Sequence, residues 1–175
     1  MKALLILLAL LSPMQAEDLS RFFQEGSNDS NAGWRPPSGR YRVRIPSGMA
    51  VQNADDLDPD MIVFDGQTRG VHAQIVIKRV DVTAGAASSQ LMLTTRDNFL
   101  SKLANFTVLS TRKMKIAGRN CSVLLGRHDF QGNKAYPLAV EQAYVIDGSD
   151  GFIIGLEVPL DSYNDMSENM KQIYQ

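Results

Sequence analysis

The sequence predicts an α+β domain, in which an antiparallel β-sheet of about six to seven strands is sandwiched by helices. Several segments carry apolar residues at every second position, which is the period of a half-buried strand. Two others repeat them at the spacing of an amphipathic helix. The segments run in the order three strands, a helix, four strands and a terminal helix. Because tight turns join most of the strands, we expect antiparallel pairing.

The first three strands are predicted at residues 40–45, 61–64 and 71–80. In the first, apolar and basic side chains alternate strictly, so that an arginine face opposes an apolar face. The arginine face consists of Arg40, Arg42 and Arg44. The third strand places Val71, Ala73, Ile75 and Ile77 on one side and Val76 and Val80 on the other.

The first helix is predicted over residues 88–105, with Ser88 or Ser89 as its cap and an apolar stripe along one side. The stripe comprises Leu91, Met92, Phe99, Leu100 and Leu103. Extended structure then resumes at 106–109, and further strands are predicted from Cys121 toward His128, at 135–146 and at 152–158. Residues 147–151 give a strong hairpin signal. A terminal helix begins at Asp161 or Ser162.

The first sixteen residues form a separate unit. Lys2 precedes an uninterrupted apolar run at residues 3–11, which is too short to span a bilayer. These features predict a signal peptide cleaved after Ala16, although a buried first helix remains the alternative. Residues 17–38 are interpreted as a short helix and a flexible linker, and residues 39–175 as the domain. The localisation predicted is periplasmic or secreted, with no transmembrane segment after cleavage.

Composition narrows the classes of function. The 175 residues suit a single domain, and 44% hydrophobic with 21% charged residues is typical of a globular protein. A net charge of −1 predicts no attraction to nucleic acid or to an anionic membrane surface. The single cysteine, Cys121, cannot form an internal disulfide; we interpret it as a buried hydrophobic residue, with a reactive thiol as the alternative.

No pattern of residues predicts a catalytic, cofactor or metal site. Asp56, Asp58 and Asp60 have the alternate spacing of calcium ligands, but nothing completes a binding loop, so a solvated acidic loop is favoured. The two histidines, His72 and His128, lack the partners of a zinc site. His128 and Asp129 point to opposite faces of a strand and cannot pair, and no Gly-x-Ser-x-Gly motif is present.

Three stretches of the sequence resemble the PsbP/DcrB/Mog-type domain family. Residues 41–49 are similar to its opening strand and proline turn, and residues 106–109 with 116–119 to the strand after its helix. Residues 152–163 are similar to its last strand and closing helix. The resemblance covers residue 39 to the C-terminus and implies an exported, DcrB-like bacterial member. It also implies an accessory or binding role without catalysis. Photosystem members assist a membrane complex, DcrB-like members are envelope proteins, and Mog-type members bind a small GTPase, a role that export excludes here.

The leading hypothesis is therefore a non-catalytic adaptor of the bacterial cell envelope that acts through protein contacts with an unknown envelope partner. Arg40, Arg42 and Arg44 are its candidate partner-binding residues, although a solvated outer strand is the favoured interpretation of that face. The alternative is a periplasmic carrier of a small apolar or lipid ligand. A large apolar cavity would favour the carrier, and a filled core with an exposed patch would favour the adaptor.

Overall fold

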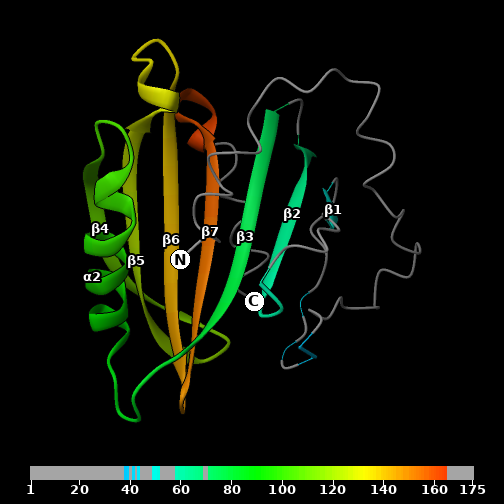
Figure 1. The fold of residues 1–175 in the computed structure, drawn as a ribbon, viewed down its shortest axis with the longest axis vertical. Helices are drawn as coiled ribbons and strands as arrows, with labels where there is room; N and C mark the ends of the chain where they lie inside the picture. Colours follow the sequence, from blue (N-terminus) through cyan, green and yellow to red (C-terminus); the bar gives the residue numbers. More distant parts are fainter. Residues whose placement is uncertain are drawn as a thin grey trace.

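The structure, a computed structural model, describes residues 38–39, 41, 43, 49–51, 58–68 and 71–164 (Figure 1). Short 3-10 helices lie at Leu100–Lys102, Phe130–Gly132 and Leu160–Ser162. The longer elements are β1 (Met49–Val51), β2 (Met61–Thr68), β3 (Val71–Asp81), α2 (Ser88–Asn98), β4 (Thr107–Ile116), β5 (Arg119–Asp129), β6 (Pro137–Asp147) and β7 (Asp150–Pro159).

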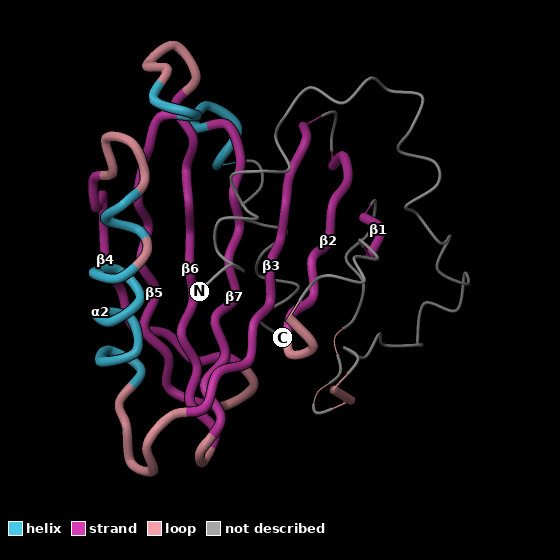
Figure 2. Tube along the Cα trace, viewed as in Figure 1, coloured by secondary structure: helices cyan, strands magenta, loops and turns pink. Residues whose placement is uncertain are grey.

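The seven strands form one antiparallel sheet in the order β1-β2-β3-β7-β6-β5-β4 (Figure 2). The predicted antiparallel sheet is therefore confirmed. Neighbours in sequence pair as hairpins, and the pairing of β3 with β7 joins the two halves of the chain. The connection through α2 carries the chain from β3 to β4 at the far edge.

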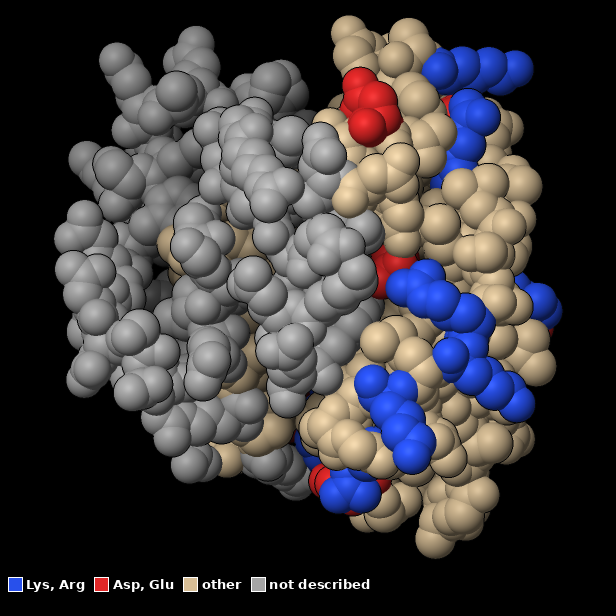
Figure 3. Space-filling model, turned by 180° about the vertical axis from the view of Figure 1, so that it is seen from behind, with Lys and Arg blue, Asp and Glu red and all other residues tan. Residues whose placement is uncertain are grey.

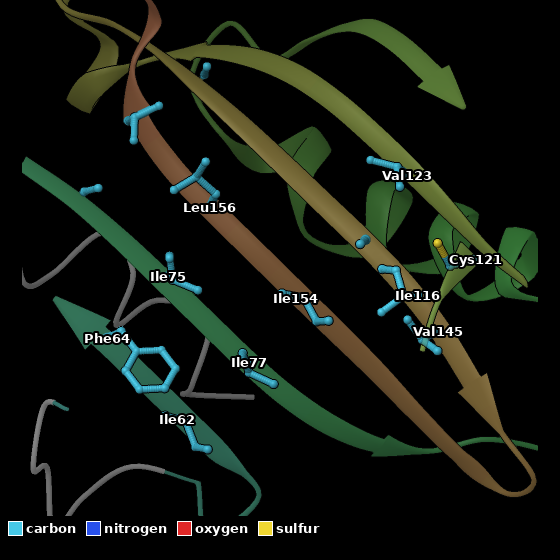
Figure 4. Close-up of a cluster of buried hydrophobic side chains, with 14 of the residues drawn as sticks. Ile62, Phe64, Ile75, Ile77, Ile116, Cys121, Val123, Val145, Ile154 and Leu156 are labelled. Carbon is cyan, nitrogen blue, oxygen red and sulfur yellow. The ribbon is translucent and has the colours of Figure 1, made fainter. Parts of the chain in front are cut away.

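The larger core lies on the back of the sheet, the face opposite α2 (Figure 4). It is built by residues of all seven described strands, which alternate along the longer strands as period-two patterning requires. Ile75, Val123 and Leu156 are at most 1% exposed. The remaining buried members are Val51, Ile62, Phe64, Ala73, Ile77, Ile116, Cys121, Ala139, Ala143, Val145, Ile154 and Val158.

The smaller core lies on the helix side, where α2 packs on β5 and β6. Its buried members are Leu100, Leu124, Val140 and Tyr144. Gly126 in β5 permits the Phe106 ring to lie directly on the sheet, because a Cβ there would stand 2.5 Å from a ring carbon.

Several sequence expectations differ from the structure. The helix ends at Asn98 rather than near residue 105, because Phe99 has φ −127° and a short 3-10 helix follows. Its N-cap is Ala87, without a side-chain cap, while Ser88 pairs its hydroxyl with that of Ser122 at 3.0 Å. Strand β1 lies at 49–51, in a segment for which no strand was predicted.

The expectation of helices on both faces is not confirmed. Within the described residues one α-helix, α2, covers part of one face, and the predicted terminal helix is described only as far as residue 164. Residues 1–37, which hold the predicted signal peptide and nearly all of the linker, lie outside the described residues. Among the described residues, no helix is long and apolar enough to cross a membrane.

Candidate functional site

The arginine face predicted for the first strand lies outside the described residues, since Arg40, Arg42 and Arg44 are all there. The basic residues that are described gather instead over β4 and β5, along the side of the molecule away from β1 (Figure 3). On the back of the sheet Arg112 bonds Glu141, and Arg127 bonds Asp129.

The two histidines lie apart and form no shared site. His72 is exposed beside Asp65, at 3.3 Å, whereas His128 is 2% exposed and bonds Glu157. In the described segments no group of three or more potential metal ligands is present.

The acidic loop forms ion pairs with β3. Asp58 bonds Lys78 at 2.9 Å, and Asp60 bonds the buried Arg79 at 3.3 Å. Burial opposes the charge on Asp58, but the hydrogen bond from the Asp60 N–H and the Lys78 ammonium outweigh it and hold the pKa of Asp58 below its usual range. Asp56 lies outside the described residues. The described part of the loop therefore serves the fold.

Cys121 is 1% exposed and packs in the back core, as the sequence predicts. Burial raises the pKa of its thiol, which disfavours the reactive thiolate.

An apolar groove lies on the helix side of the sheet, next to α2. The helix packs on β5 and β6, and β7 and β3 extend beyond it (Figure 1). The groove has a volume of about 250 Å³. Its floor comes from β3, β6 and β7, and its wall from the end of α2 and the turn that follows. Apolar lining residues are Met61, Val76, Val80, Phe99, Leu100, Leu103, Val140, Ile153 and Leu156, and the polar ones are Gln74, Lys78, Thr95, Gln142 and Glu157.

A buried acid–imidazole pair lies at one end of this groove. Glu157 lines the groove, and its Oε2 stands 3.1 Å from Nε2 of His128, whose side chain lies below. The Glu157 side chain is 10% exposed. The other ring nitrogen of His128 is buried without a hydrogen-bond partner in the described part of the chain. The groove thus combines apolar walls with one deeply placed carboxylate.

Solved structures with a similar fold come from three different settings. The Saccharomyces cerevisiae Ran-binding protein Mog1p has a TM-score of 0.55 and 11% identity, covering 79% of this chain and 82% of that one. The Mycobacterium tuberculosis protein LpqN, involved in cell envelope biogenesis, has a TM-score of 0.53 and 14% identity, covering 75% and 78%. Cyanobacterial PsbP from Synechocystis has a TM-score of 0.53 and 11% identity, covering 86% and 94%.

This chain has a PsbP/Mog-like fold. The resemblance that residues 39–175 predict is therefore confirmed at the level of the fold. No family model and no curated protein matches the sequence. At 11–14% identity the PsbP/Mog-like fold fixes the architecture and leaves function to the site itself.

Sequence reasoning did not find the groove or its carboxylate. Glu157 and His128 lie on different strands with β6 between them, so only the register of β5, β6 and β7 brings them together. Alternation along the strands did predict part of the groove floor. It placed Val76 and Val80 on the side away from Ile75, and that side is the groove floor.

Proposed function

We propose that this protein is an exported, non-catalytic accessory protein of the bacterial cell envelope that acts as an adaptor through protein contacts. The signal-peptide pattern at the N-terminus, Lys2 followed by the apolar run at residues 3–11, supports export. The fold shared with the envelope protein LpqN and the Ran-binding protein Mog1p supports a role in binding. The non-catalytic part rests on the sequence, which contains no nucleophile motif.

The observation that carries the adaptor proposal is the outer edge of β4, which pairs with no further strand among the described residues. This strand has ten residues, stands last in the sheet order and is exposed over its first seven residues. An unpaired strand edge offers backbone N–H and C=O groups to an extended segment of another protein.

The side chains of β4 indicate what partner would pair there. Val108 and Leu109 are 40% and 50% exposed, large for apolar residues. Lys113 and Lys115 are exposed on the helix side of the strand, whereas Arg112, on the back, is already paired with Glu141. The two lysines favour an acidic extended segment. The β4 edge, defined as residues 108–115, is the proposed contact surface.

Crosslinking in intact cells, followed by capture of the tagged protein and mass spectrometry, tests this proposal. We expect one dominant envelope protein, lost when Lys113→Glu and Lys115→Glu are combined and retained in the matched control Lys102→Glu, which reverses an exposed charge after α2. A parallel variant changes Arg40, Arg42 and Arg44 to Glu. Loss only in that variant would move the contact to the first predicted strand, and the absence of any protein partner would contradict the adaptor role.

A carrier of a small apolar ligand is the second candidate, and the groove is the observation that favours it. Its volume of about 250 Å³ exceeds the ~150 Å³ that suffices for a benzene ring. The test is native mass spectrometry of the protein purified gently from cells. A stoichiometric small molecule, absent from Gly155→Val, would support the carrier. Its absence from both proteins would contradict it.

We also propose that a helix beginning near Asp161 covers the back of the sheet. Leu160 and Tyr163, at its expected start, already pack against the back core. Hydrogen exchange would test this: amides beyond residue 164 should be protected with the period of a helix.

A further inference from the structure

We infer that the groove binds a short apolar chain ending in a protonated amine, and that Glu157 receives the amine. This inference rests on the carrier function, the second candidate above, and specifies its ligand. It is carried by the contrast between the apolar walls and one deeply placed carboxylate, Glu157, which no arginine or lysine among the described residues pairs with.

The walls of the groove select an apolar chain. Val76 and Ile153 lie on the floor from β3 and β7, and Phe99 and Leu103 close the side next to α2. Phe99 is 39% exposed, so covering it with an apolar ligand removes apolar surface from water. The volume of about 250 Å³ exceeds the ~150 Å³ of a cavity that holds benzene, so a short apolar chain fits.

The environment of Glu157 selects a cation. Two other buried carboxylates have permanently charged or multiple partners: Glu141 accepts from Arg112 and Tyr163, and Asp129 from Arg127 and Asn105. Glu157 differs, because within the described residues its partner is the imidazole of His128 alone.

Among the described residues, no arginine or lysine pairs with Glu157, although the walls around it are apolar. A buried charge without a counter-charge is costly, so a ligand cation that reaches the second carboxylate oxygen is stabilised there. An ammonium brought by the ligand would neutralise the carboxylate and donate a charge-assisted hydrogen bond to it.

The opposite end of the groove does not favour an anion. Lys78 lies four residues along β3 from Gln74, which stands directly opposite Glu157, so the two ends are about 13 Å apart. The Lys78 ammonium is held by Asp58 at 2.9 Å and is thereby neutralised. A carboxylate head group, as in a fatty acid, therefore meets Glu157 at one end and a compensated lysine at the other. The charge pattern favours amines over acids.

Titration calorimetry with three eight-carbon probes, octylammonium, octanol and octanoate, tests the inference on the protein purified after expression of the full chain. We expect octylammonium to bind most tightly and octanoate most weakly. In Glu157→Gln the advantage of octylammonium over octanol should fall by about tenfold, since a charge-assisted hydrogen bond is lost. The control Asp147→Asn removes the charge of a half-exposed carboxylate at the β6–β7 turn and should leave the affinities for all three probes unchanged.

A second variant keeps the test decisive if Glu157→Gln folds poorly. A Cβ at Gly155, a residue that lines the groove, would meet no atom closer than 3.7 Å, so Gly155→Val adds a side chain there without a clash at its Cβ and should weaken the binding of all three probes together. Octanoate binding as tightly as octylammonium, or an octylammonium preference that survives Glu157→Gln, would overturn the inference and leave the carrier standing. Failure of all three probes to bind would overturn both.

Discussion

Gly126 shows how one missing side chain shapes the helix side of the sheet. Its hydrogen faces the Phe106 ring, and a Cβ would lie 2.5 Å from Cε2 and 3.3 Å from the Thr107 carbonyl oxygen. We expect Gly126→Ala to lower the free energy of unfolding by about 1–3 kcal/mol through overpacking, measured by urea denaturation.

Gly155 provides the matched control for this prediction, because its nearest neighbours would be 3.7 Å from an added Cβ. Gly155→Ala should change the free energy of unfolding by less than about 0.5 kcal/mol. Combining Gly126→Ala with Phe106→Leu should recover part of the loss. Equal effects of the two glycine variants would show that the ring contact is unimportant.

Tyr163 makes the protein sensitive to alkali. Burial, reinforced by the hydrogen bond to Glu141, raises the pKa of Tyr163 to about 12, against an ordinary 10. The folded state therefore keeps this proton longer than the unfolded chain does. The resulting stabilisation is complete below about pH 10 and is lost as the pH rises toward 12.

We expect the free energy of unfolding to fall between pH 10 and 12, and to fall less steeply in Tyr163→Phe. Denaturation at a series of alkaline pH values measures this. Tyr41 and Tyr144, whose pKa values burial also raises, should retain a residual slope in the variant. Identical slopes in the two proteins would contradict the assignment.

At the scale of elements, the β4–β5 hairpin holds an alanine, Ala117, in a backbone conformation that destabilises the fold. Ala117 and Gly118 both have positive φ, +48° and +77°, which is the geometry of a type I′ turn. Glycine adopts it freely, but alanine does not. We expect Ala117→Asn to raise the free energy of unfolding by about 0.5–1 kcal/mol and Gly118→Ala to lower it by about 1 kcal/mol. Thermal denaturation of the two variants gives the sign of each effect, and stabilisation by both would contradict the turn assignment.

The elements that could be predicted are those with a strong local signal. Residues 71–80 and 152–158 alternate clearly and match β3 and β7 closely, and the glycine-rich segment 147–151 marks the turn between β6 and β7. The end of α2 could not be predicted, because the apolar stripe continues through Phe99 and Leu103 although the backbone turns there. Phe99 and Leu103 have the sequence spacing of a continuing helix, but they lie outside α2, on either side of the short 3-10 helix.

The candidate site was hidden for a related reason. The sequence shows His128 beside Asp129, but strand geometry sends them to opposite faces, and the actual partner is Glu157. Which strands become neighbours is a long-range outcome that local periodicity does not contain. The groove itself exists because α2 covers only part of its face, and helix placement also depends on tertiary packing.

At the scale of the whole molecule, two cores share a single sheet. Val123 and Leu124 are neighbours in β5, both 0% exposed, yet Val123 belongs to the back core and Leu124 to the helix-side core. Every strand from β5 to β7 contributes to both. Damage to either core should therefore destabilise the same cooperative unit.

We expect Leu124→Ala to lower the free energy of unfolding by about 2–5 kcal/mol, and Val123→Ala by less because fewer carbon atoms are removed. Both variants should unfold in one transition with an unchanged denaturant slope, as followed by circular dichroism and by hydrogen exchange. Two separate transitions in either variant would show that the faces unfold independently.

The burial of Cys121 in the back core makes its thiol a natural reporter of how often the fold opens. A thiol that is 1% exposed, at the third residue of β5, reacts with a water-soluble reagent only when this part of the sheet opens. The rate of labelling under native conditions therefore reports how often the fold opens. Since the chain has one cysteine, the signal comes from a single place. A ligand that fills the groove, on the other side of the same sheet, would stabilise the closed fold and so slow the labelling of Cys121, which makes the native thiol a reporter of binding.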